Sequence, residues 1–235
     1  ADYIGCMSEV NRRYLIEHNP WLDASKIEVF PNTKKLTEDI NPEGLPMRHR
    51  YGIPDESCVF LCGGNMGKPQ YIELLCEAIK RCKDEPRINF LFVGRGTDRY
   101  KLEQTINTNR INNALLVEDL PRHEYEQITK ECDIGLVTLD PRFTIPNCPS
   151  RILSYMEYSK PVLAATDMVC DYKQLIDEAG CGEWVWSGDI ESFVSKAIEM
   201  SKSGRLNEMG RNGRRYIETH FDVSRSVQIL EERFA

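Results

Sequence analysis

The chain has 235 residues, 41% of them hydrophobic, which is enough to bury a full core in one large domain or in a domain with an appendage. Its net charge of -7 argues against a general nucleic-acid surface, because binding to a phosphate backbone needs a basic face. No apolar run approaches the roughly 20 residues of a membrane-spanning helix and no signal-peptide pattern is present, so we expect a cytoplasmic protein.

Residues 1–50 differ in character from the rest of the chain. They read as a capped helix over 8–18, a short strand over 26–30, a turn at 31–33 and a polar segment dotted with prolines. The chain also starts without a methionine, in what looks like the middle of an element. We therefore expect a fragment whose first 50 residues are a connector and the end of a preceding domain.

From residue 58 onward, short apolar runs alternate with amphipathic stretches, which is typical of a parallel sheet covered by helices on both faces. The pattern predicts strands over 58–62, 88–93, 114–117, 133–138, 161–165 and 183–186, and helices over 70–82, 100–106, 123–132 and 150–159. Three further helices, over 191–201, 205–219 and 223–234, follow the last strand. The sequence thus predicts an α/β fold with a helical C-terminal tail.

Nine cysteines are scattered through the chain, mostly inside apolar runs such as residues 58–62. No CxxC pair occurs, and none of the four histidines stands at a metal-ligand spacing from a cysteine. We interpret the cysteines as small core residues of a reducing compartment, and we expect no metal site.

The segment 149–164 reads as a helix that opens at a loop and runs into a short buried strand. Ser150 is a candidate N-cap and Arg151 lies in the first turn, so backbone N–H groups, the helix dipole and a guanidinium could converge on one anion. The alternative interpretation is an ordinary capped helix with a solvated arginine.

Two glycine turns follow neighbouring predicted strands. Gly63-Gly64-Asn65-Met66-Gly67-Lys68 follows the first strand and Gly94-Arg95-Gly96 follows the second, so both lie at the carboxyl edge where α/β sheets bind ligands. Neither turn has the spacing of a dinucleotide fingerprint or a P-loop. A cluster of Arg95, Arg151 and Lys68 facing a glycine loop would suit a diphosphate. Tight turns and an Arg95–Asp98 surface pair are the alternatives.

Several motifs together resemble glycosyltransferase family 4 (group 1), over roughly residues 1–220. They are Pro31-Asn32-Thr33 after a strand, the Gly-Gly-Asn-Met-Gly turn with Gln70 behind it, residues 92–96 and 132–134, and Pro149-Ser150-Arg151 leading to residues 160–164. No single motif is decisive, but their succession is specific. It is most similar to the bacterial branch that builds capsular polysaccharides and exopolysaccharides.

This resemblance implies a GT-B architecture, in which two Rossmann-like domains face one another and the carboxyl-terminal one holds the nucleotide-sugar donor. Residues 51–220 would be that donor-binding domain. Residues 221–235 would form a helix that crosses toward the absent N-terminal domain. Such a fragment would bind donor and be inactive alone.

The resemblance also implies the site residues. Arg151 and Lys68 would balance the charge of the departing diphosphate and are the catalytic candidates. Residues 117–120 would meet the nucleobase. The candidate donor-binding residues are Gly64, Asn65, Met66, Gly67, Arg95, Leu120, Pro149, Ser150, Ile152 and Ser154. The two glutamates of the family signature would fall at Pro146 and Ser154, so both carboxylates are absent here.

The implied activity is transfer of a hexose-type sugar from a nucleotide-sugar to a cell-surface polysaccharide or lipid-linked glycan, with retention and without metal or cofactor. The lipid-linked or oligosaccharide acceptor would bind through the missing domain, with the full-length protein peripheral to the inner face of the membrane. Because both glutamates are missing, a non-catalytic nucleotide-sugar-binding or scaffold protein is the alternative. An oxidoreductase is disfavoured because no Gly-x-Gly-x-x-Gly fingerprint appears.

Overall fold

The structure is a computed structural model that describes residues 1–42, 46–148 and 150–234. Within those ranges its centre is a parallel sheet of six strands, each within one residue of its predicted bounds. The strands are β3 (Cys58–Gly63), β4 (Ile88–Val93), β5 (Ala114–Val117), β6 (Ile134–Thr138), β7 (Val162–Thr166) and β8 (Gly182–Trp186). Their order across the sheet is β5-β4-β3-β6-β7-β8.

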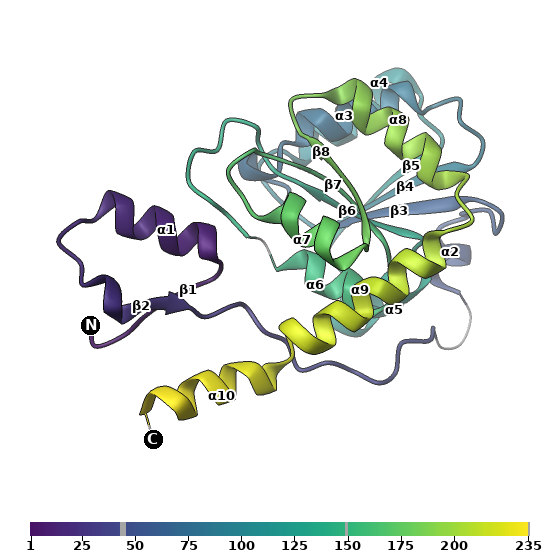
Figure 1. Cartoon of the computed structure of the whole chain (residues 1–235). Coiled ribbons are helices and arrows are strands. Elements are labelled where there is room, and N and C mark those ends of the chain that lie inside the picture. Colours follow the sequence, from purple (N-terminus) through teal and green to yellow (C-terminus); the bar gives the residue numbers. More distant parts are fainter. Residues whose placement is uncertain (43–45, 149, 235) are drawn as a thin grey trace.

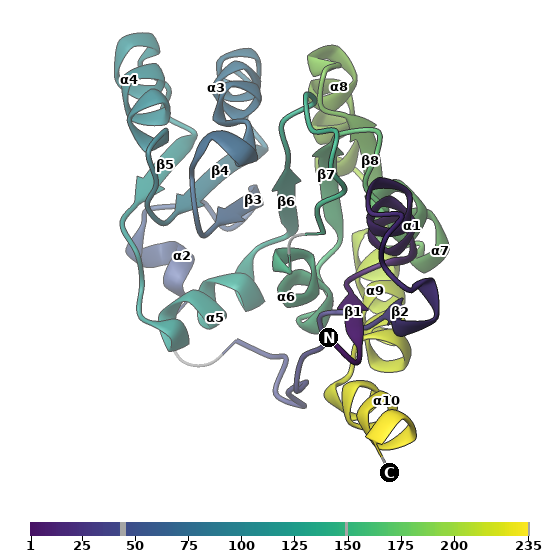
Figure 2. The ribbon, with the colours of Figure 1, turned by 90° about the vertical axis from the view of Figure 1, so that its left-hand side faces the viewer.

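Helices cover both faces of this sheet, as Figures 1 and 2 show. One face carries α3 (Ile72–Arg81), α4 (Arg99–Asn109) and α8 (Ile190–Ser201). The other carries α2 (Met47–Arg50), α5 (Arg122–Glu131), α6 (Arg151–Glu157), α7 (Tyr172–Ala179) and α9 (Leu206–His220). The predicted α/β architecture is therefore confirmed.

Alternating side chains of the strands fill two apolar layers. Phe60, Phe90 and Phe92 point toward α3 and α8, whereas Leu61 and Leu91 point toward α6, and all five are buried. Successive residues of a strand face opposite sides of the sheet, so strands covered on both faces are apolar throughout. Each such side chain contributes roughly 1.5–3 kcal/mol when it is fully buried.

The sheet has its topological switch point between β3 and β6. Chain connections leave these adjacent strands in opposite directions across the sheet. In open α/β sheets, ligands bind outside the carboxyl ends of the strands at such a point. Both glycine turns, the one after β3 and the one after β4, lie at this edge.

Helix α7 is not among the helices that we predicted. It is amphipathic, with Tyr172, Leu175, Ile176 and Ala179 buried against the sheet, and it ends at Gly180 in the left-handed conformation. These buried positions follow the i, i+3, i+4, i+7 helical spacing. A helical signal was thus present between the last two strands, but in a segment of only eight residues.

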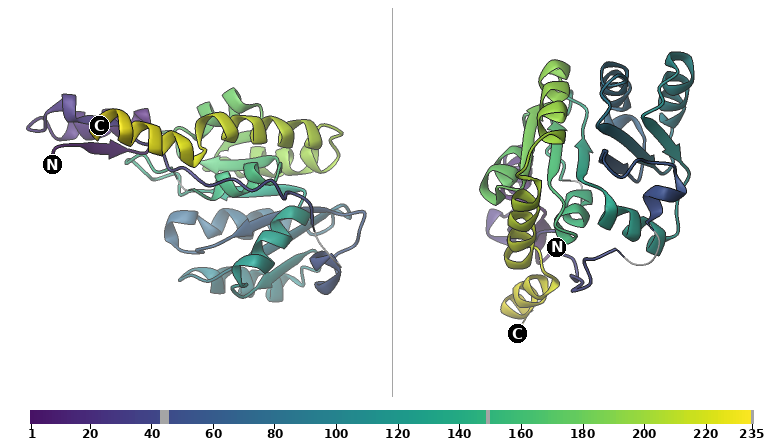
Figure 3. Two further views of the ribbon diagram at one scale, coloured as in Figure 1. Left: turned by 90° about the horizontal axis from the view of Figure 1, so that it is seen from below. Right: turned by 90° about the vertical axis from the view of Figure 1, so that its right-hand side faces the viewer.

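The N-terminal residues form a small separate unit beside the sheet. Strand β1 (Ile4–Cys6) pairs in parallel with β2 (Ile27–Val29), and α1 (Glu9–His18) and the 3-10 turn η1 (Ala24–Lys26) connect them. The C-terminal helix α10 (Val223–Phe234) returns to this unit (Figures 1 and 3). There the rings of Tyr3 and Phe234 lie 6.2 Å apart, and Arg233 pairs with Glu28. In the described residues, no helix is both long enough and apolar enough to cross a membrane.

Candidate functional site

Hydrogen bonds tie the two glycine turns to each other. The N–H of Met66 donates to the carbonyl of Arg95 at 2.7 Å, and the N–H of Asp98 donates back to the carbonyl of Met66 at 2.9 Å. Gly96 has φ +154°, and a Cβ there would overlap the backbone of Met66. The turns after β3 and β4 therefore form one rigid surface. At position 96 only glycine, which has no Cβ, lets the two backbones approach this closely.

Arg151 reaches this surface from the first turn of α6. Its Nη2 donates to the carbonyl of Asn65 at 3.3 Å, and its Nη1 lies 3.6 Å from the sulfur of Cys62. Burial raises the pKa of the Cys62 thiol, so this neighbour stays neutral and leaves the guanidinium charge uncompensated. Among the side chains that the structure describes, no carboxylate pairs with Arg151.

A cleft of about 480 Å³ opens beside Arg151. It is lined by Gly63, Gly64, Val93, Asp119, Leu120, Tyr125, Ser150, Arg151 and Ser154. These residues come from the ends of β3, β4 and β5 and from the helices α5 and α6. A Cβ on Gly64 would lie 3.6 Å from Nη2 of Arg151, so the glycine turn and the guanidinium face one another in the same cleft.

Hydrogen-bond donors dominate the polar lining of this cleft. Burial raises the pKa of Tyr125 to about 12, so its phenol keeps its proton at neutral pH. Asp119 supplies the one carboxylate among the described lining residues, and it is paired with Arg95. A cleft with an uncompensated guanidinium and neutral donors is suited to an anion with many acceptor oxygens.

The model of the family described as "Glycosyl transferases group 1" matches residues 46–216, well over half of the chain. The chain belongs to this family. The match contains all six strands of the sheet and every residue that lines the cleft.

Two curated relatives are similar in sequence to this group 1 glycosyltransferase chain. It is 29% identical over 224 residues to the "Probable glycosyltransferase WbjE" of Pseudomonas aeruginosa, covering 95% of this chain and 52% of that protein. It is 28% identical over 117 residues to the "Putative colanic acid biosynthesis glycosyl transferase WcaI" of Escherichia coli K12, covering 48% of this chain and 27% of that protein. The chain thus spans at most about half the length of these relatives.

Solved structures share the fold. The crystal structure of Anabaena Alr3699/HepE in complex with UDP and glucose superposes with a TM-score of 0.81 at 18% identity, over 99% of this chain and 62% of that one. The structure of WaaG, a glycosyltransferase involved in lipopolysaccharide biosynthesis, superposes with a TM-score of 0.74 at 16% identity, over 97% of this chain and 61% of that one. At these identities the likeness shows the fold, which is that of GT-B glycosyltransferases.

Five of the predicted site residues line the cleft of the group 1 glycosyltransferase: Gly64, Leu120, Ser150, Arg151 and Ser154. Ser150 occupies the N-cap position of α6, but its side chain makes no capping hydrogen bond, because its backbone is already helical. Pro149 lies outside the described residues.

Other predicted residues lie close to the cleft without lining it. Asn65 and Gly67 belong to the turn, where the side chain of Gln70 accepts hydrogen bonds from Nδ2 of Asn65 and from the N–H of Gly67. The side chains of Met66 and Ile152 are each 1% exposed and belong to the two apolar layers. Their side chains pack in the core behind the cleft residues, and because they are buried they cannot touch a ligand in the cleft.

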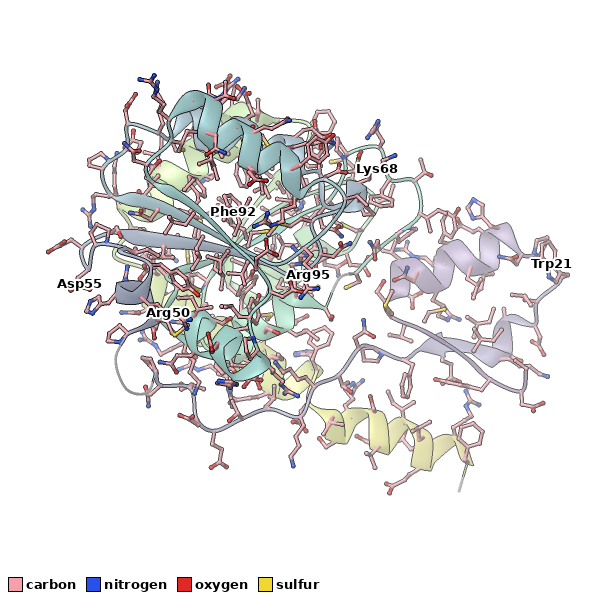
Figure 4. The ribbon with its side chains drawn as sticks, turned by 180° about the vertical axis from the view of Figure 1, so that it is seen from behind. Trp21, Arg50, Asp55, Lys68, Phe92 and Arg95 are labelled. Carbon is pink, nitrogen blue, oxygen red and sulfur yellow. The ribbon has the colours of Figure 1, made fainter. Side chains whose placement is uncertain are left out.

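The two remaining cations have separate surroundings. Arg95 forms an ion pair with Asp119 and not, as the alternative interpretation supposed, with Asp98. Asp98 is paired with Lys101 instead. Lys68 lies on the other side of the turn, where it helps to line a smaller pocket of about 240 Å³ with Asp140 and Arg142. Figure 4 shows both Lys68 and Arg95 on the side of the sheet that faces the N-terminal unit.

Three lining residues, Gly63, Val93 and Tyr125, are not among the candidate site residues, although the sequence analysis placed Gly63 in the first glycine turn and Val93 in the 92–96 motif. Gly63 and Val93 end their strands immediately before the two glycine turns, so their positions could have been found from the strand ends. Tyr125 is different, because it sits on the second helix after β4 and only the packing of α5 brings it to the cleft.

Proposed function

We propose that this chain is the donor-binding, C-terminal half of a family 4 glycosyltransferase that moves a hexose-type sugar from a nucleotide-sugar to a cell-surface polysaccharide or lipid-linked glycan. The observation that carries the proposal is the uncompensated guanidinium of Arg151 facing Gly64 in the cleft. A guanidinium and backbone N–H groups at a helix start bind phosphate oxygens well.

In this proposal the cleft holds the nucleoside diphosphate part of the donor. Arg151 binds the diphosphate, and residues 117–120 at the end of β5 meet the nucleobase. UDP in the complex of the similarly folded HepE supports a nucleotide ligand. Lys68, on the far side of the glycine turn, would help to stabilise the negative charge that develops on the diphosphate as the sugar departs.

The transfer would proceed with retention and without a metal ion. A diphosphate leaving group can instead be stabilised by fixed cations and backbone N–H groups. Analysis of the anomeric configuration of the product by NMR, with a longer form of the protein, tests retention directly.

The proposed domain organisation assigns residues 1–50 to the connector and the end of the N-terminal domain, 51–220 to the donor domain, and 221–235 to the crossing helix. The contacts of α10 with the β1–α1–β2 unit support it. A two-stranded sheet is marginal by itself, so this unit would gain stability from further strands.

The acceptor, a lipid-linked or other oligosaccharide, would bind through the N-terminal domain of the whole protein, at the cytoplasmic face of the membrane. The name of WcaI, a putative glycosyl transferase of colanic acid biosynthesis, supports a bacterial glycan as the product. Capsular or exopolysaccharide assembly is the specific role that we propose.

A titration of the chain with UDP, GDP and inorganic pyrophosphate tests donor binding. We expect at least one nucleoside diphosphate to bind, with an affinity that falls as ionic strength rises. Arg151→Ala should weaken binding by roughly 10- to 100-fold, because it removes charged hydrogen bonds. The matched control Arg211→Ala, on the exposed side of α9, should bind like the wild type. Equal affinity of wild type and Arg151→Ala would contradict the proposal.

A second candidate function is a nucleotide-sugar-binding or scaffold protein that does not catalyse transfer. The observation in its favour is Ser154, which lies in the cleft where the family signature has a glutamate. Turnover of a nucleotide-sugar by the longer protein with a lipid-linked acceptor would exclude this function, whereas donor binding without turnover would support it.

A further inference from the structure

One face of α6 connects the cleft to a buried ion pair. Ser154 follows Arg151 by three residues and Glu157 follows Ser154 by three, so Ser154 is the surface neighbour of both along α6. Arg151 and Ser154 line the cleft, whereas the Glu157 side chain is 2% exposed. A charged group buried this deeply needs a fixed partner.

That partner comes from the connector that leads out of the N-terminal unit. The ammonium of Lys34 pairs with Oε2 of Glu157, and the N–H of Thr37 donates to its Oε1 at 3.0 Å. The same ammonium donates to Oγ of Ser154 at 3.4 Å. Lys34 thus touches both the buried carboxylate and a residue of the cleft.

The backbone of Lys34 is fixed as well. Its N–H donates to the carbonyl of Phe221 at 2.8 Å, and its carbonyl accepts from the N–H of Val223 at 3.1 Å. These bonds attach the connector to the junction of α9 and α10, which Figure 1 shows beside it. The ammonium therefore approaches α6 from a backbone held in place by a second segment.

The chemistry of an ammonium determines the direction of the Lys34–Ser154 hydrogen bond. An ammonium has three N–H donors and no acceptor, so Oγ of Ser154 must accept. The hydroxyl hydrogen of Ser154 is then free to point into the cleft. A carboxylate at this position would accept hydrogen bonds from the ligand, whereas Ser154 with Lys34 behind it can donate one.

We propose that Lys34 is a positioning residue that orients Ser154 as a hydrogen-bond donor to an oxygen of the ribose–phosphate unit of the bound nucleotide. This inference rests on the proposed nucleotide-sugar function. Ser154 stands one helical turn beyond Arg151, about 4.5 Å along the axis. A group that Ser154 contacts would thus adjoin the phosphate at Arg151, and the ribose and its attached phosphate have only oxygen atoms to offer as acceptors there.

A double-mutant cycle with UDP and GDP as probes tests this role. Lys34→Met alone would leave Glu157 buried without a cation, so the informative variant is Lys34→Met/Glu157→Gln, which removes both charges. Ser154→Ala removes the donor, and Ser154→Thr keeps it. Lys35→Met, an exposed neighbour in the connector, is the matched control. Thermal unfolding of each variant separates loss of affinity from loss of structure.

We expect Ser154→Ala and Lys34→Met/Glu157→Gln each to weaken binding by about 3- to 10-fold, as loss of one hydrogen bond would. The triple variant should bind no more weakly than the weaker of the two, because both changes remove the same interaction. Ser154→Thr keeps the hydroxyl and should recover most of the affinity that Ser154→Ala loses, whereas Lys35→Met should bind like the wild type.

Additive losses, or unchanged affinity in Lys34→Met/Glu157→Gln, would overturn the role of Lys34. If Arg151→Ala still weakens binding in that case, the proposed function stands and only this inference fails. If the wild type binds no nucleoside diphosphate, both fail together.

Discussion

Gly94 stands directly against the backbone of Gly64, so the turns after β3 and β4 are in contact at their glycines. A Cβ on Gly94 would overlap the carbonyl oxygen of Gly64 and stand 3.0 Å from its carbonyl carbon. Both residues have positive φ, +138° for Gly94 and +99° for Gly64. The surface that faces Arg151 therefore depends on the absence of two side chains.

The variant Gly94→Ala should destabilise the protein by about 2 kcal/mol or more, because alanine adds both an unfavourable backbone conformation and an overlap with Gly64. Urea unfolding measures this loss. Gly204→Ala is the matched control, since no atom lies within 4 Å of the added Cβ, and it should change stability by less than about 0.5 kcal/mol. Equal stability of the two variants would show that the turns can separate without cost.

Lys68→Ala should change nucleoside diphosphate affinity by less than about 3-fold, because Lys68 lines the pocket beside Asp140 and not the Arg151 cleft. Calorimetric titration beside Arg151→Ala measures the difference. The proposed role of Lys68 in sugar departure predicts that the same change lowers the rate of sugar transfer by a form that includes the proposed N-terminal domain. A loss of affinity as large as that of Arg151→Ala would instead place the Lys68 ammonium on the bound diphosphate.

Lys34→Met should cost roughly 3–5 kcal/mol of unfolding free energy, because it leaves the Glu157 carboxylate buried without its cation. Lys34→Met/Glu157→Gln should cost less than the single change, since no charge remains to be buried. Chemical denaturation of both variants provides the comparison. If the double variant were the less stable of the two, burial of the Glu157 carboxylate would not require the Lys34 ammonium.

Asp98 should make stability sensitive to acid. Hydrogen bonding to Lys101 lowers the pKa of Asp98 from its ordinary value of 3.8. The folded protein therefore binds this proton less readily than the unfolded chain, and the stabilisation is present above pH 3.8 and lost as the pH falls through the lowered pKa.

The difference in unfolding free energy between wild type and Asp98→Asn should be constant above about pH 5 and should shrink below about pH 4. Denaturation curves recorded between pH 3 and pH 7 measure it. Removing the cation with Lys101→Met should abolish most of this pH dependence. If the difference in unfolding free energy instead grows as the pH falls, folding raises the pKa of Asp98 and does not lower it.

The strands of the sheet could be predicted from the sequence alone. Every strand of the parallel sheet lies within one residue of its predicted bounds, because a strand buried on both faces must be apolar throughout and is bounded by polar turns. The sequence also placed Gly64 and Arg151 at one edge, since the carboxyl ends of parallel strands meet there. Helix α7 could have been predicted too, because its four buried residues keep the helical spacing.

Which cations share a cleft could not be predicted, because it depends on how separate elements pack against one another. All three candidate cations follow strand ends at the same edge of the sheet: Arg95, Lys68 and Arg151. Arg95 forms an ion pair with Asp119, and the glycine turn separates Lys68 from Arg151, so these two line different pockets. The contact of Lys34 with α6 spans 120 residues of sequence and has no local pattern. Hydrophobic periodicity indicates which side of a helix or strand is buried. The neighbours of a side chain depend on how separate elements pack against one another. No short stretch of sequence contains the information about that packing.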